Sequence, residues 1–165
     1  IYLITGVMAS GKSTVAELLA KNMERCVHLH GDIFRKMIVS GRVDMSENAA
    51  KEAFDQLYLR YRMTAIAAKE YLDAGFNVVV QDNYYGKALT DMINLLLPYV
   101  PKVIVLNPSL NIVRKREMDR GKKGYTGFDT GVLYEAFQAE TPKIGLWIDT
   151  SDMSPEETVR RIMEY

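Results

Sequence analysis

The stretch Gly6-Val7-Met8-Ala9-Ser10-Gly11-Lys12-Ser13 fits the pattern Gly-x-x-x-x-Gly-Lys-Ser/Thr, which is typical of loops that bind nucleotide phosphates. The apolar, β-branched run at residues 1–5 predicts a buried strand before it, and residues 14–21 predict a helix after it. This order matters because glycines let several backbone N–H groups point at one anion, and the helix N-terminus adds its positive dipole end. We therefore expect the chain to bind a nucleoside triphosphate.

Two side chains of this loop have separate expected tasks. Lys12 would reach the β- and γ-phosphates, and the Ser13 hydroxyl would ligate Mg²⁺. The residues expected to contact the nucleotide are Gly6, Met8, Ala9, Ser10, Gly11, Lys12, Ser13 and Thr14. The loop pattern alone matches by chance in roughly one chain in a hundred of this length, so the flanking strand and helix are what make it specific.

The composition favours a soluble protein of the cytoplasm. With 165 residues the chain is long enough to bury a full core, so we expect a single domain over residues 1–165. Lys and Arg together number 21, as do Asp and Glu, and this balance favours neither nucleic acid nor a membrane surface as a partner. The single cysteine, Cys26, excludes an internal disulfide and fits a reducing compartment, and no apolar run could span a bilayer. The oligomeric state stays open.

Strands and helices are expected to alternate along the chain, which is typical of an α/β protein with helices on both faces of a parallel sheet. After the first strand, further strands are expected at residues 26–30, 76–80, 102–106 and 145–149. Helices are expected at residues 33–39, 48–74, 89–97, 110–119, 130–139 and from 154 onward. The last helix has a favourable start, with Ser154 as its cap and Pro155 in its first position.

Two aspartates follow expected strands. Asp32 comes after Gly31 at the tip of the second strand, and Asp82 comes after the third strand and Gln81. Ligands of an open parallel sheet bind at the carboxyl ends of its strands, where the phosphate loop also lies. We expect Asp82 to hold Mg²⁺ directly or through water, and Asp32 to accept the proton of a hydroxyl that attacks the γ-phosphate. The alternatives are local roles, as a turn residue at position 82 and a helix N-cap at position 32.

A dense basic run leads into a glycine-rich segment at residues 121–127. The basic residues are Arg114, Lys115, Arg116, Arg120, Lys122 and Lys123. Because phosphoryl transfer spreads negative charge over oxygens, cations on a mobile segment can close over it, and we expect a lid at about residues 116–128. Arg116 and Arg120 would assist catalysis from one helical face, with Arg120 also contacting the nucleotide. The alternative is an ordinary solvated helix face.

The acceptor is expected to lie beyond the second and third strands. Arg35, Tyr84 and Tyr85 are the candidates for contact with it, besides Asp32, because aromatic surfaces with polar tips suit a weakly charged ligand. His28 and His30 alternate on the second strand and therefore share a face. No further ligand lies near them in the sequence, so packing explains them better than a metal site does.

These motifs together resemble the small P-loop kinases related to adenylate, shikimate and gluconate kinases, and more narrowly the chloramphenicol phosphotransferase-like group. The matching pieces span nearly the whole chain, at residues 6–13, 31–32, 75–82, 116–121 and 148–150. The resemblance implies a five-stranded parallel sheet in the order 2-3-1-4-5, a catalytic base at Asp32 and lid arginines at 116 and 120. It also implies that the loop at residues 150–153 lies against the adenine.

One departure from the related kinases bears on the acceptor. Residues 31–35 resemble the Gly-Asp-x-x-Arg of nucleoside monophosphate kinases, whose arginine grips the acceptor's phosphate. Those enzymes also need a second arginine four residues after the acid that matches Asp82, and Gly86 stands there instead. Lys87 follows, but a lysine does not grip a phosphate at two points. We therefore expect an acceptor that carries a free hydroxyl and no phosphate.

The sequence thus predicts an ATP- and Mg²⁺-dependent kinase that phosphorylates a hydroxyl of a small metabolite, sugar acid or antibiotic. One alternative is a nucleoside monophosphate or adenylylsulfate kinase, which the missing second arginine disfavours. Another is a nucleotide-binding switch with little turnover, in which Asp32 would be only a cap. The identity of the acceptor does not follow from the sequence.

Overall fold

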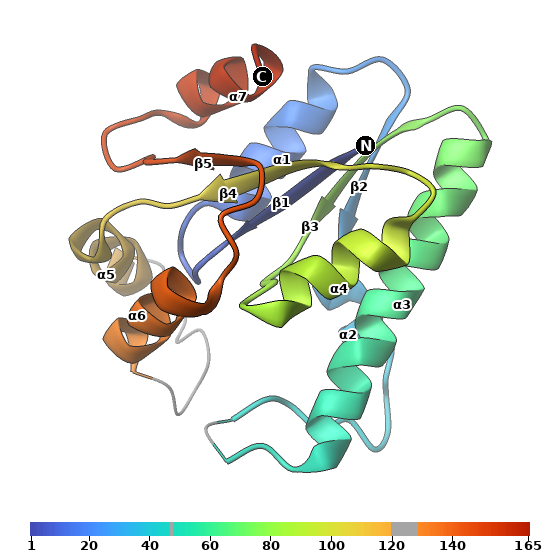
Figure 1. Ribbon diagram of the computed structural model, residues 1–165, viewed down its shortest axis with the longest axis vertical. Helices are drawn as coiled ribbons and strands as arrows, with labels where there is room; N and C mark the ends of the chain where they lie inside the picture. Colours follow the sequence, from blue (N-terminus) through green and yellow to red (C-terminus); the bar gives the residue numbers. More distant parts are fainter. Residues whose placement is uncertain (47, 120–128) are drawn as a thin grey trace.

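The computed structural model describes residues 1–46, 48–119 and 129–165. Its centre is a five-stranded parallel sheet in the order β2-β3-β1-β4-β5 (Figure 1). The strands are β1 (Tyr2–Gly6), β2 (Cys26–His30), β3 (Asn77–Gln81), β4 (Lys102–Leu106) and β5 (Leu146–Ile148). The predicted α/β class and strand order are therefore confirmed.

Helices follow the strands as predicted, with differences at some ends. They are α1 (Lys12–Lys21), α2 (Asp32–Lys36), α3 (Lys51–Asp73), α4 (Lys87–Leu96), α5 (Leu110–Asp119), α6 (Thr130–Glu140) and α7 (Pro155–Met163). The prediction extended α2 to residue 39, but Val39 is 97% exposed and has no core to pack against. β5 is shorter than predicted because it is an edge strand that pairs only with β4. Within the described ranges, no helix combines the length and apolar character needed to cross a membrane.

The sheet is apolar on both faces because helices cover both. Leu3 and Ile4 are successive residues of β1, and both side chains are fully buried, in different core clusters. Leu3 belongs with residues of α3, α4 and α6, whereas Ile4 belongs with residues of α1 and α7. Figure 1 shows this three-layer arrangement, with α1 and α7 on one side of the strands and α3 and α4 on the other. Strands buried on both faces read as continuous apolar runs, which is why they were recognisable in the sequence.

A buried pair of hydrogen bonds ties the segment after β3 to β1. Thr5 Oγ1 accepts a hydrogen bond from Tyr84 N at 3.0 Å and donates one to Tyr84 O at 3.3 Å. The Tyr84 ring is fully buried and packs on Tyr61 of α3, with 5.0 Å between ring centroids. These contacts hold the chain just beyond Asp82 at the carboxyl edge of the sheet.

We expect Thr5→Val to lower the free energy of unfolding by about 1–3 kcal/mol, because it leaves buried N–H and C=O groups of Tyr84 without their partner. Thr64→Val is the matched control: Thr64 is also fully buried, but its Oγ1 donates to Arg60 O within a helix, where that carbonyl sits in the helical ladder. Urea unfolding monitored by circular dichroism gives both values. Equal losses for the two variants would show that the Thr5 contacts contribute little.

Candidate active site

The phosphate-binding pattern forms a tight turn from β1 into α1. Ala9 and Gly11 have positive φ angles of +59° and +96°, and Gly11 is the N-cap of α1. No side chain in the described structure caps this helix, so its first N–H groups remain available to an anion. Lys12 Nζ donates to Gly6 O at 2.8 Å and to Val7 O at 2.7 Å, which holds the ammonium group across the loop. The loop therefore has the donors that a polyphosphate requires.

A cavity of about 570 Å³ lies beside this loop, at the carboxyl ends of β2 and β3. The loop, α2, residues 38–45 and the first half of α3 supply its walls. Its charged side chains are Lys12, Asp32, Arg35, Arg42, Asp44, Arg60 and Asp82. Its apolar side chains come chiefly from the walls far from the loop, at Ile38, Val43, Met45, Ala53 and Leu57.

Gln56 of α3 holds the outer wall of the cavity in place. Its Oε1 accepts from Val43 N at 2.9 Å, and its Nε2 donates to Gly41 O at 2.8 Å. The backbone of residues 41–43 is thereby bound to α3 by one side chain. Arg35 adds a second attachment, because its Nη1 donates to Asp44 Oδ1 at 2.5 Å.

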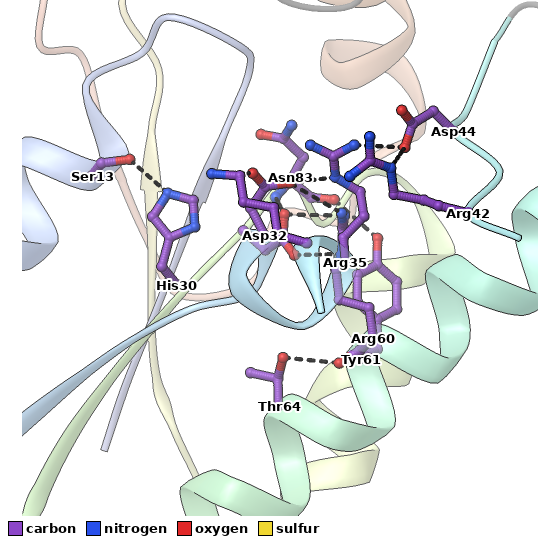
Figure 2. Close-up of polar contacts among 12 residues, drawn as sticks. Ser13, His30, Asp32, Arg35, Arg42, Asp44, Arg60, Tyr61, Thr64 and Asn83 are labelled. Carbon is purple, nitrogen blue, oxygen red and sulfur yellow. Dashed lines mark hydrogen bonds and ion pairs between the residues drawn. The ribbon is translucent and has the colours of Figure 1, made fainter. Parts of the chain in front are cut away.

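Asp32 lies within a chain of ion pairs that reaches this wall (Figure 2). Its Oδ1 accepts from Arg35 Nε at 2.6 Å, and its Oδ2 lies 3.1 Å from Lys36 Nζ. Burial raises the pKa of Asp32, but the hydrogen bonds from Arg35 and Lys36 outweigh it and lower that pKa to about 2. The carboxylate is therefore ionised at neutral pH. Gly31 is the N-cap of α2, and within the described chain no side chain caps that helix, so the N-cap alternative for Asp32 is not observed.

Arg60 of α3 grips the Asp82 carboxylate in a buried ion pair. Arg60 Nη2 donates to Asp82 Oδ1 at 3.2 Å, and Arg60 Nε lies 3.0 Å from Oδ2. Each residue is only 7% exposed. Burial raises the pKa of Asp82, and the positive charge of Arg60 acts in the opposite direction. Arg60 Nη1 also lies 3.9 Å from Asp32 Oδ1, so one guanidinium stands between both predicted catalytic-site carboxylates.

Gly31 makes room for Asp82 at this position. A Cβ atom at residue 31 would lie 2.1 Å from Asp82 Oδ2, which no real contact allows. Any side chain there would push the carboxylate away from Arg60. The glycine that precedes Asp32 is therefore needed for the position of Asp82, 51 residues later in the chain.

The Ser13 hydroxyl contacts two strand ends. Its Oγ lies 3.3 Å from His30 Nε2 and accepts from Gln81 Nε2 at 3.3 Å. His30 and Gln81 are register partners of β2 and β3, so their side chains emerge together on one face. His30 thus does more than pack against the core, contrary to the sequence-based expectation.

The oxygen atoms of Ser13 and Asp82 beside the loop suit Mg²⁺, which prefers oxygen ligands. In the described ranges no cluster of three or more His, Cys, Asp or Glu side chains could hold a metal ion. Phosphate oxygens of a nucleotide would have to complete the coordination, which is the usual arrangement for Mg²⁺ in kinases. These residues therefore fit a metal that arrives together with its nucleotide.

A second cavity, of about 390 Å³, lies on the opposite side of the loop, between α5 and the segment after β5. Arg116 crosses it: Nη1 donates to Ser10 O at 3.3 Å, and Nη2 donates to Thr150 O at 3.0 Å. Thr150 and Met153 line the same cavity, in the segment expected to lie against adenine. Arg120, Lys122, Lys123 and most of the expected lid, residues 120–128, lie outside the described residues.

The two tyrosines expected to face the acceptor do not line either cavity in the described part of the chain. Tyr84 is fully buried, because its backbone is anchored to Thr5 in the orientation that sends its ring into the core. Tyr85 packs on Phe137, with 5.4 Å between ring centroids. The expectation that they contact the substrate is corrected accordingly.

Sequence reasoning missed Arg42, Asp44, Gln56 and Arg60, which all line the first cavity. Of these four residues, Arg60 could have been recognised from the sequence. Arg60 falls on the face of α3 that also carries buried Ala53 and Thr64. A charged residue on the buried face of a helix needs a partner, and Asp82 is that partner. The other three depend on how residues 38–45 line the cavity, which no local sequence pattern reveals.

A family model described as chloramphenicol phosphotransferase-like protein matches residues 1–165. The fold is also similar to the Mycobacterium tuberculosis APS kinase CysC in complex with AMPPNP and APS (TM-score 0.71, 18% identity, covering 99% of this chain and 95% of that one). A gluconokinase from Sinorhizobium meliloti 1021 gives a TM-score of 0.66 at 16% identity, with 99% and 89% coverage. A longer chain in the Pnkp1/Rnl/Hen1 RNA repair complex gives 0.64 at 19% identity, where 83% of this chain spans 42% of that one. No curated protein matched the sequence.

We expect Arg60→Met to lower the free energy of unfolding by about 3–5 kcal/mol, because it leaves the buried Asp82 carboxylate without its cation. Asp82→Asn in the same chain should recover a large part of this loss, since the remaining group is neutral. Chemical unfolding of the two single variants and the double variant measures the coupling, and Arg62→Met on the exposed face of α3 is the control. Additive effects would contradict a direct Arg60–Asp82 interaction.

Proposed function

Because the chain belongs to the chloramphenicol phosphotransferase-like family, we propose that it is a kinase that uses ATP and Mg²⁺ to phosphorylate a hydroxyl of a small molecule. The observation that carries this proposal is the arrangement of the larger cavity. At one wall is a phosphate-binding loop, and facing it is an ionised Asp32 next to space for a second ligand. A protein that only bound a nucleotide would have no need of that second space.

The nucleotide would bind across both cavities. Loop N–H groups and Lys12 would hold its phosphates, and the base would enter the smaller cavity beside Arg116. Ser13 would hold Mg²⁺, together with Asp82 directly or through water. When bound, the metal would supply positive charge that neutralises the charge developing during transfer.

Asp32 would receive the acceptor's proton late in the reaction. The acceptor oxygen forms a bond to the γ-phosphorus, the bond from that phosphorus to the bridging oxygen breaks, and ADP departs. A carboxylate with a pKa of about 2 cannot deprotonate an alcohol before attack. It can orient the hydroxyl as a hydrogen-bond acceptor and take the proton once bond formation makes the oxygen acidic. This order fits the loose transition state of phosphoryl transfer.

The charges of the acceptor side favour a substrate without a phosphate, for a different reason from the one given by the sequence. The absence of an arginine at position 86 does not decide the question, because Arg42 and Arg60 lie in the same cavity as Arg35 and supply further positive charge. Within the described residues, however, these arginines are matched by three aspartates at positions 32, 44 and 82. A phosphate dianion needs more cations than Arg42 alone, and engaging Arg35 or Arg60 as well would break their close ion pairs. The Arg60–Asp82 pair is desolvated, so separating it is costly.

One observation favours a sugar acid among the possible acceptors. Arg42 is held only at a distance, with its Nε 3.8 Å from Asp44 Oδ1. Its side chain is 43% exposed at the cavity wall, so a single carboxylate could approach it without breaking a close ion pair. Arginine suits a carboxylate because the planar guanidinium binds both of its oxygens.

We expect Asp32→Asn to lower kcat by about 10²–10⁴-fold with little effect on nucleotide affinity, because the amide is a very poor proton acceptor. Lys12→Ala should instead lose nucleotide affinity as well as turnover, since it removes the charge between the phosphates. Acceptor-dependent ADP release gives turnover, and calorimetry with the non-hydrolysable analogue AMPPNP gives affinity. Asp55→Asn, in an exposed ion pair with Lys51, is the control. Near-normal turnover of Asp32→Asn would remove this residue from the chemistry.

A screen of acceptors tests the proposed function itself. A coupled assay of ADP release should respond to sugars, sugar acids or hydroxylated antibiotics, and not to nucleoside monophosphates or adenylylsulfate. Stimulation only by the phosphate-bearing compounds would instead make the protein a nucleotide or adenylylsulfate kinase. ATP binding without stimulation by any class would favour a non-catalytic nucleotide-binding switch.

A further inference from the structure

We propose that His30 and Gln81 are positioning residues that orient the Ser13 hydroxyl so that one of its lone pairs faces Mg²⁺. The inference rests on the proposed function, because it concerns the metal that accompanies the nucleotide. It goes beyond that function by giving a role to two side chains at strand ends, both of which line the larger cavity.

The backbone brings the three groups together from separate elements. His30 ends β2 and Gln81 ends β3, and the two are paired in the parallel register. Ser13 is the second residue of α1, and its Oγ lies 3.3 Å from both His30 Nε2 and Gln81 Nε2. Figure 2 shows one nitrogen of the His30 ring directed at the Ser13 hydroxyl. The hydroxyl is thereby held from the sheet side while α1 carries its backbone.

The number of hydrogen bonds that the Ser13 hydroxyl can make limits its orientation. A serine hydroxyl has one proton to donate and two lone pairs. Gln81 Nε2 donates to Ser13 Oγ and occupies one lone pair. In the tautomer of His30 that carries its proton on Nδ1, Nε2 accepts the Ser13 proton, and the other lone pair of Ser13 is left for a metal ion. Without these two partners the hydroxyl could rotate, and it could donate its proton toward the site at which the cation must bind.

The burial of Gln81 supports a positioning role. Gln81 is only 2% exposed at the end of β3, where it follows three fully buried valines. A buried amide costs free energy unless it is hydrogen-bonded, and an apolar residue would pack there more cheaply. The Gln81 side chain directs its amide to Ser13, so its polarity serves that hydroxyl.

Calorimetry of AMPPNP binding separates this role from a general effect on the loop. His30→Leu and Gln81→Met each remove one partner of Ser13 and put an apolar side chain of similar size in its place. We expect each to weaken AMPPNP binding about 10-fold in the presence of Mg²⁺, as loss of groups that orient metal ligands commonly does. In EDTA, where no metal binds, each variant should bind AMPPNP as the wild type does. His30→Gln, which can restore an acceptor near the Nε2 position, should recover most of the loss.

His28→Leu is the matched control, because His28 lies on the same strand and the same face, with 6.2 Å between its ring and that of His30. It should bind AMPPNP normally with and without Mg²⁺. Wild-type affinity of the His30 and Gln81 variants in Mg²⁺, or an equal loss in Mg²⁺ and in EDTA, would overturn the inference and leave the proposed kinase intact. If His30→Leu does not fold, Gln81→Met decides by the same criterion. A wild-type protein that binds no nucleotide would contradict the proposed function itself.

Discussion

The buried ion pair between Arg60 and Asp82 joins the two halves of the candidate site. Asp82 stands at the end of β3 beside the phosphate loop, whereas Arg60 belongs to α3, which also lines the larger cavity. A desolvated carboxylate needs a cation in contact, so the position of α3 along the sheet is tied to the chemistry at its edge. The absence of a side chain at Gly31 lets the carboxylate occupy this position. This ion pair therefore helps to fix the two parts of the site relative to each other, together with the packing of Tyr61 on Tyr84.

The nucleotide half of the site could be predicted because its determinants are consecutive in the sequence. The segment 6–13 encodes its own turn, and Asp32 and Asp82 each follow an apolar run that ends at the sheet edge. The strand order was predicted from the resemblance that these motifs carry, and the structure confirms it. Such features need no knowledge of how distant segments meet.

The acceptor half could not be predicted to the same depth, because its residues meet only in the folded chain. Arg42 and Asp44 lie in a stretch without regular structure, and Arg60 reaches the cavity from a long helix. Tyr84 shows the opposite error: an aromatic residue after a strand suggested a pocket wall, but a backbone contact with Thr5 turns it inward. Local sequence does not distinguish these two directions. The same limit explains why His30 was assigned to packing.

The attachment of residues 41–45 to the rest of the protein has a consequence for how such a protein can diversify. This wall is held to α3 by Gln56 and to α2 by the Arg35–Asp44 contact, and it belongs to no strand or helix. Insertions or replacements there would reshape the room for the acceptor while the phosphate loop and the sheet stayed as they are. Exposed loops tolerate such changes far better than packed elements do. The fold thus separates a packed phosphate loop and sheet from a wall segment that can change without rebuilding them.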